Sequence, residues 1–127
     1  RNVRRFEKDF PDAQVILLHV IESEERAEGA MSPSQRRARQ DITRYLKQVS
    51  DSLSSSGVRC EWAVSMGAPA VDIPRHAAQR QADLIIMSTR GYGGASQGRV
   101  GSVAAAVVAS GKTPVLLAKP PEEVAAR

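Results

Sequence analysis

The residues best suited to chemistry lie in a glycine-rich stretch that follows the apolar run Leu84–Met87. Five glycines fall within eleven positions, and Ser102 with a run of alanine and valine comes directly after them. These glycines are Gly91, Gly93, Gly94, Gly98 and Gly101. Glycines let backbone N–H groups approach a phosphate, and a helix start adds unpaired N–H donors with partial positive charge. The stretch therefore predicts an anion-binding loop, and the alternative is a flexible surface loop.

Two widespread phosphate-binding motifs do not fit this stretch. Residues 111–113 read Gly-Lys-Thr like the end of a P-loop, but the first glycine of that motif would fall on Ala106. They also precede an expected strand rather than follow one. A dinucleotide motif starting at Gly91 has Ser96 in place of its third glycine. Neither motif explains the loop.

The loop must be held by elements whose sequence patterns are readable. Apolar runs at Gln14–Val20, Leu84–Met87 and Val115–Leu117 are typical of strands buried on both faces of a parallel sheet. Residues 58–64 alternate apolar and other side chains, which indicates a half-exposed strand near the sheet edge. The helix that starts at Ser102 should end before residue 111.

A long helix is predicted after Ser32, where Pro33 and Gln35 complete a capping box, and the serines before Gly57 should end it. Its inward face is expected to hold Ala38, Ile42, Tyr45, Leu46, Val49 and Leu53. The spacing of apolar residues in the first ten positions predicts the second half of a further amphipathic helix.

Another helix is predicted from the turn at Pro69 to about Gln81. Pro74 inside it leaves two alternatives: a later start capped by Asp72, or a kink.

The resulting order is β-α-β-α-β-loop-α-β, with crossovers long enough for parallel strands. We expect one domain over residues 1–127 with an α/β fold: a doubly wound parallel sheet in a three-layer α/β/α sandwich of Rossmann-like type. Ligands of such folds bind beyond the carboxyl ends of the strands.

Composition limits the classes of function. The 127 residues carry a net charge of +4 with scattered bases and only 4% aromatics, which argues against nucleic acid as a partner. No apolar run is long enough for a membrane span and no signal peptide is visible, so the cytoplasm is the expected location. His19 stands alone in a strand, so no metal site is expected. No catalytic triad or carboxylate pair is readable.

The spacing Ser88-x2-Gly91-x9-Gly101-Ser102, together with the flanking strands, resembles the G-x2-G-x9-G-[ST] signature of ATP-binding universal stress proteins. Ser88 stands where the family has its first glycine. The resemblance implies a sheet order of 3-2-1-4-5 and a homodimer. The residues that it implies for ATP are Val20 at its strand end for adenine, Met87 and Ser88 near ribose and phosphates, Arg90 and Gly91 along the loop, and Gly101, Ser102 and Val103 at the phosphates.

The family's first strand, which enters the middle of the sheet, has no counterpart in the sequence. Without it, buried backbone groups would lack partners, so we expect the chain to be truncated at its N-terminus, with the strand present in the full protein or supplied by another copy. The apolar strand Val115–Leu117 would form an open sheet edge, which predicts dimerisation there.

The function expected from the resemblance is a stress-response regulatory module that binds ATP, with or without Mg²⁺, and turns it over slowly or not at all. The alternative is a dimeric stress protein that binds no nucleotide and acts through protein contacts.

Overall fold

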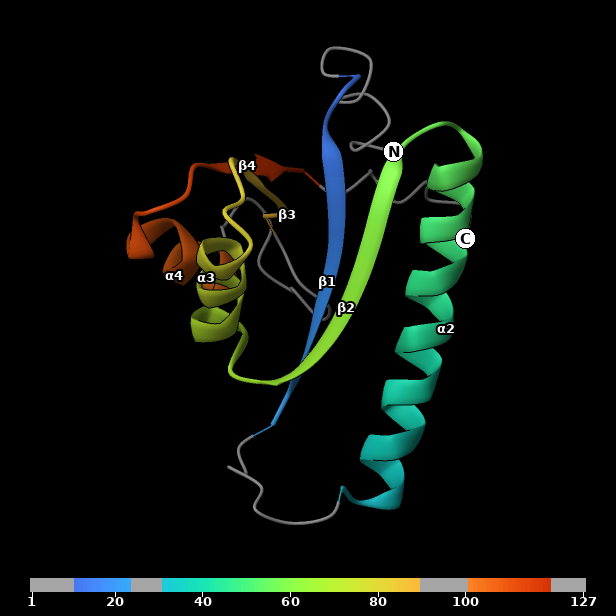
Figure 1. The fold of residues 1–127 in the computed structure, drawn as a ribbon. Coiled ribbons are helices and arrows are strands. Elements are labelled where there is room, and N and C mark those ends of the chain that lie inside the picture. The colour runs from blue at the N-terminus through green and yellow to red at the C-terminus, as the bar shows by residue number, and fades with distance from the viewer. Residues whose placement is uncertain (1–10, 24–30, 90–100, 120–127) are drawn as a thin grey trace, which may run out of the picture. The chain divides into compact units, whose positions relative to one another are not determined.

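The computed structural model describes residues 11–23, 31–89 and 101–119. The chain forms two compact units, residues 1–68 and 69–127, and each is described by itself. Strands and helices alternate along both (Figure 1). The predicted half-helix in the first ten residues lies outside the described residues.

The first unit is a β-α-β arrangement. It contains strand β1 (Gln14–Glu22), helix α2 (Pro33–Ser55) and strand β2 (Arg59–Gly67). The two strands are parallel, in a register that runs from Gln14 opposite Arg59 to Glu22 opposite Gly67. Helix α2 lies alongside this sheet and contacts β2 more extensively than β1 (Figure 1). The predicted strands are confirmed, and both run further toward their carboxyl ends than the sequence indicated.

Helix α2 begins with the predicted capping box. The Ser32 hydroxyl accepts a hydrogen bond from the Gln35 N–H at 3.2 Å, and Gln35 Oε1 accepts one from the Ser32 N–H at 2.9 Å. Two donors that a helix start normally leaves unpaired are thereby satisfied by side chains. Pro33 occupies the first turn, where its missing N–H costs nothing.

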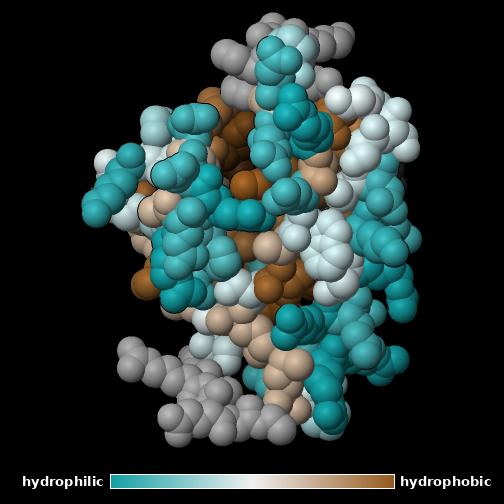
Figure 2. Space-filling model, viewed as in Figure 1, coloured by the Kyte–Doolittle hydropathy of each residue, from teal (hydrophilic) through white to brown (hydrophobic). Residues whose placement is uncertain are grey.

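The face that α2 buries differs in one respect from the expected one. Leu46, Ser50 and Leu53 are buried, whereas Tyr45 is 61% exposed, so the prediction for Tyr45 was wrong. Ser50 lies one turn from both Leu46 and Leu53 and is therefore on the same face of the helix as these two buried leucines. Its hydroxyl donates to the Cys60 carbonyl at 3.4 Å, which makes burial of this polar group acceptable. In Figure 2 mostly hydrophilic surface covers the other side of α2.

The second unit holds the remaining elements: helix α3 (Pro69–Gln79), strand β3 (Ile85–Ser88), helix α4 (Ser102–Ser110) and strand β4 (Val115–Ala118). Strands β3 and β4 are parallel, from Ile85 opposite Val115 to Ser88 opposite Ala118. Helix α3 packs on α4. The buried apolar side chains of this unit, among the described residues, are Ala77, Ala104 and Val107.

Helix α3 starts at Pro69 and contains Pro74, so the alternative of a late start at Asp72 was wrong. Asp72 is instead a buried side chain, 6% exposed, and it forms an ion pair of 2.8 Å with Arg75 one turn later. Pro74 has no N–H to donate to the carbonyl one turn earlier. The helix nevertheless continues through it to Gln79.

The strands of the described residues pair as β1–β2 and β3–β4. The parallel α/β class is therefore confirmed, and the single-domain assignment stays a prediction. No helix within the described part of the chain is long and apolar enough to cross a membrane.

Two helices end in the same way with different residues. At the end of α2 the Val58 N–H donates to the Leu53 carbonyl and the Gly57 N–H to the Ser54 carbonyl, both at 3.0 Å. At the end of α3 the corresponding bonds run from Ala82 to Ala77 and from Gln81 to Ala78. This is the Schellman arrangement, which needs a left-handed residue after the helix. Gly57 has φ of 90°, but in α3 the position is held by Gln81 with φ of 53°.

We expect Gln81→Gly to raise the free energy of unfolding by about 0.5–1 kcal/mol, because glycine adopts positive φ without a steric cost. Gly57→Ala should lower it by about 1 kcal/mol through backbone strain alone, since a Cβ there would meet nothing within 4 Å. Urea unfolding measures both changes. Gln79→Gly, at the last residue of α3, is the control and should destabilise by up to about 1 kcal/mol; a loss of stability in Gln81→Gly would contradict the argument.

Candidate anion-binding site

The carboxyl end of β3 and the start of α4 are joined by backbone hydrogen bonds. The Thr89 N–H donates to the Ala118 carbonyl at 3.0 Å, which extends the β3–β4 ladder by one residue. The Gly101 N–H donates to the Thr89 carbonyl at 2.6 Å. The two ends of the glycine-rich loop are thus fixed beside each other, while Arg90, Gly91 and the rest of the loop lie outside the described residues.

The amino terminus of α4 offers donors that its own helix does not use. Gly101 is the N-cap and provides no side-chain bond; the Ala105 N–H, donating to the Gly101 carbonyl at 2.9 Å, makes the first bond of the helix. The N–H groups of Ser102, Val103 and Ala104 find no backbone acceptor among the described residues. The free N–H donors and the partial positive charge of the helix start together form an arrangement suited to an anion.

The side chains around this helix start leave it accessible. Ser102 is exposed, and Gly101 and Val103 are half-buried. Met87, half-buried, lies opposite Leu117 in the sheet, and Ser88 lies at the exposed end of β3. Five of the predicted site residues are therefore gathered where β3 ends and α4 begins: Met87, Ser88, Gly101, Ser102 and Val103.

The backbone conformation at three positions of this site bears on which residue types they accept. Gly101 has φ of −63° and ψ of 158°, so no left-handed conformation requires glycine there. Ser88 is part of the extended strand β3 and is not among the residues with positive φ, so serine fits this position without backbone strain. Ser102 is the first residue of α4 and Gly101 is its N-cap, and no side chain caps this helix.

Val20 is placed differently from the expectation. Strand β1 continues two residues beyond it to Glu22, so Val20 is not the end of its strand. It pairs with Ser65 of β2 and belongs to the unit of residues 1–68, whereas the five residues above belong to the unit of residues 69–127. The expectation that it ends the strand was wrong.

Thr89 is a residue of this site that the sequence analysis missed. Its contribution is the backbone carbonyl that accepts the Gly101 N–H, and a backbone contribution leaves no mark on residue type. The signal available was its place directly after an apolar run and before the glycines. In the described residues no three His, Cys, Asp or Glu side chains are grouped to hold a metal ion.

This β-α-β arrangement, with a loop closed at a helix start, is of the Rossmann-like α/β class. Comparison with known proteins is consistent with it: residues 3–119 match the model of the universal stress protein family. The chain is 31% identical over 120 residues to universal stress protein MJ0531 of Methanocaldococcus jannaschii, covering 91% of this chain and 70% of that protein. The chain belongs to the universal stress protein family.

Solved structures share the fold. Hypothetical protein MJ0577 superposes with a TM-score of 0.77 at 25% identity, over 87% of this chain and 78% of that one. A universal stress protein family protein from Arabidopsis thaliana, with AMP bound, superposes with a TM-score of 0.64 at 22% identity, over 95% of this chain and 74% of that one.

The position of Ser102 predicts how its removal affects folding. Because its hydroxyl does not cap α4, Ser102→Ala should change the free energy of unfolding by less than about 0.5 kcal/mol. Ser32→Ala is the matched control; it removes a side-chain cap and should cost about 1 kcal/mol. Thermal and urea unfolding without nucleotide compare the two. An equal loss in both variants would show that Ser102 has a capping role.

Proposed function

We propose that the chain is a regulatory module that binds an adenine nucleotide, ATP in particular, with its phosphates at the amino terminus of α4. The observation that carries this proposal is the set of unpaired N–H groups at Ser102, Val103 and Ala104, fixed next to the end of β3 by the bond between Gly101 and Thr89. Donors that point the same way at a helix start are the usual backbone site for phosphate.

The contrast with α2 supports this assignment. Both helices start from nearly the same N-cap conformation, with φ of −63° and ψ of 159° at Ser32 and 158° at Gly101. In α2 the side chains of Ser32 and Gln35 occupy the donors, whereas α4 has no side-chain cap. A ligand that reaches α4 therefore has no internal acceptor to displace at Gly101.

The remaining contacts of the proposal follow the family signature. Met87 and Ser88 would lie near the ribose and phosphates, Arg90 and Gly91 along the loop, and Gly101, Ser102 and Val103 at the phosphates, with Val20 toward adenine. A relative of the same fold has AMP bound, which supports adenine nucleotide as the ligand class. Mg²⁺ would accompany ATP as a counterion of its phosphates. The module would act by nucleotide occupancy, with slow hydrolysis or none.

Ser102 gives the sharpest test of this proposal. A hydroxyl that donates to a charged phosphate oxygen contributes roughly 1.5–3 kcal/mol, so Ser102→Ala should weaken ATP binding about tenfold to a hundredfold. Calorimetric titration of ATP into wild type and variant measures the change. Ser55→Ala, at the last residue of α2 in the other unit, is the control and should bind like wild type. Equal affinities of Ser102→Ala and wild type would refute the phosphate site, and no binding by wild type would favour the alternative of a stress protein that acts through protein contacts.

We further propose that the protein forms a homodimer through β4. Within the described residues β4 pairs on one side, with β3, and Leu116 in its middle is 45% exposed. An apolar strand edge of this kind is seldom left open to water. Antiparallel pairing of two β4 strands, or contacts beside them, would cover it.

Leu116→Lys should shift the protein to a monomer, because two lysine side chains would then meet at the interface and lose hydration. Light scattering at several protein concentrations measures the state. Val108→Lys is the matched control, since Val108 is 47% exposed and belongs to α4 rather than to β4; this variant should remain dimeric. A wild type that is monomeric throughout, or a dimeric Leu116→Lys, would contradict the proposal.

A further inference from the structure

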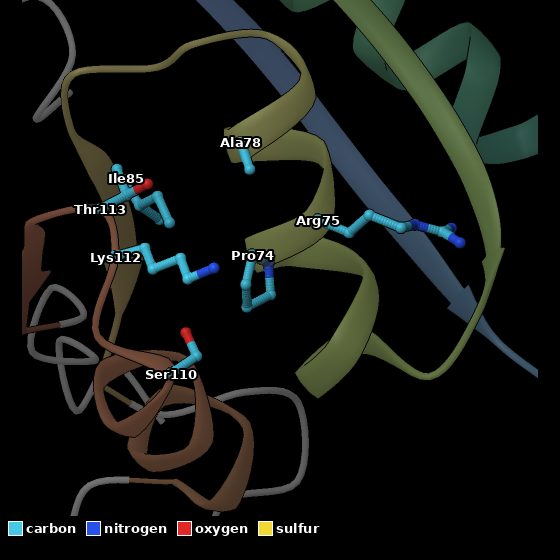
Figure 3. A pocket seen from close by; sticks show the side chains of 7 residues that line it. All are labelled: Pro74, Arg75, Ala78, Ile85, Ser110, Lys112 and Thr113. Carbon is cyan, nitrogen blue, oxygen red and sulfur yellow. The ribbon is translucent and has the colours of Figure 1, made fainter.

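The second unit contains a small pocket at the end of its sheet opposite to the anion-binding site. It lies between α3, the start of β3, and the turn from α4 to β4, and has a volume of about 260 Å³ (Figure 3). Its lining residues are Pro74, Arg75, Ala78, Ile85, Ser110, Lys112 and Thr113. The turn from α4 includes the Gly-Lys-Thr sequence of residues 111–113, which the nucleotide site does not use.

The positive charge inside this pocket comes from Lys112. In Figure 3 its side chain extends across the pocket, and its amino group lies between Pro74 and the Ser110 hydroxyl. No carboxylate of the described residues forms an ion pair with it. Arg75 also lines the pocket, but its guanidinium points away and is bound to Asp72 at 2.8 Å. A ligand would therefore meet a single ammonium group that has no anionic partner in the described structure.

The rest of the lining is mainly apolar. Pro74 and Ala78 of α3 face Ile85 at the start of β3, and the Pro74 nitrogen carries no hydrogen to donate. The Ser110 hydroxyl donates to the Val107 carbonyl at 2.7 Å, which leaves the Ser110 oxygen as an acceptor that can orient the Lys112 ammonium. The volume lies slightly below the usual range for drug-sized ligands. A compact apolar body with one anionic group matches these properties.

We propose that this pocket binds a small monocarboxylate: the apolar body lies against Pro74, Ala78 and Ile85, and the carboxylate pairs with Lys112. The site is separate from the nucleotide site, because α4 has nine residues between them, or about 12 Å of helix. It does not depend on nucleotide binding. The competing explanation is that Lys112 only neutralises the negative carboxyl end of α4.

The probe is benzoate, with benzamide as its uncharged counterpart, titrated into the whole chain while backbone amide resonances are followed by NMR. We expect benzoate to shift the amides of Ala78, Ile85 and Thr113, and benzamide to bind more weakly. Lys112→Gln should weaken benzoate binding about threefold to fivefold, as suits an exposed ion pair, and should bring benzoate and benzamide to equal affinity. Ala78→Leu, which fills the apolar part, should remove binding of both.

Lys47→Gln is the matched control, because Lys47 is an exposed lysine of α2 in the other unit; it should bind benzoate like wild type. The proposal is overturned if benzoate causes no localised shifts up to about 20 mM, a concentration that saturates millimolar sites. It is also overturned if benzamide binds as well as benzoate, or if Lys112→Gln lowers the melting temperature and leaves benzoate affinity unchanged. That last result would assign Lys112 to the end of α4.

Discussion

The hydrogen bond from the Gly101 N–H to the Thr89 carbonyl is the constraint on which the candidate site depends. Thr89 also donates its own N–H to Ala118, so this one residue links the end of β3, the end of β4 and the start of α4. Because the bond fixes where α4 begins, it also fixes where the unpaired N–H groups of Ser102 and Val103 lie.

Each unit of the chain contains a parallel β-α-β arrangement, with α2 as the connecting helix in the first and α4 in the second. The starts of these two helices differ. In the first, the capping box of Ser32 and Gln35 satisfies the helix start internally, which stabilises α2 regardless of any ligand. In the second, α4 begins at a glycine with no side-chain cap. The parallel strands require a crossover in both cases, and of these two crossover helices α4 is the one whose start has no side-chain cap.

The sequence predicted what local patterns determine. Apolar runs identified β1, β3 and β4, and Ser32 with Gln35 identified the start of α2, because each pattern reflects burial or a bond between near neighbours. It failed where the outcome depended on which side chains tertiary packing buries. Ser50 is buried in place of Tyr45 because the Cys60 carbonyl accepts its hydroxyl, and Asp72 is buried beside Arg75 rather than capping a helix. Thr89 acts through its backbone, which no side-chain pattern records.

The backbone conformation at position 101 does not itself require glycine, which agrees with the phosphate contact that we propose there. Its backbone conformation is the one that Ser32 adopts at the start of α2, so a residue with a side chain could occupy it without strain. A serine or aspartate there would add a capping bond, and glycine forgoes only a few tenths of a kcal/mol relative to such a cap. What glycine alone provides is the absence of a side chain that would compete for the α4 donors or obstruct an approaching phosphate. The reverse holds at Ser88, where the family signature has glycine but the extended strand accepts serine. The two positions therefore differ: the extended strand sets the backbone at position 88, whereas at position 101 the proposed phosphate contact would favour a residue without a side chain.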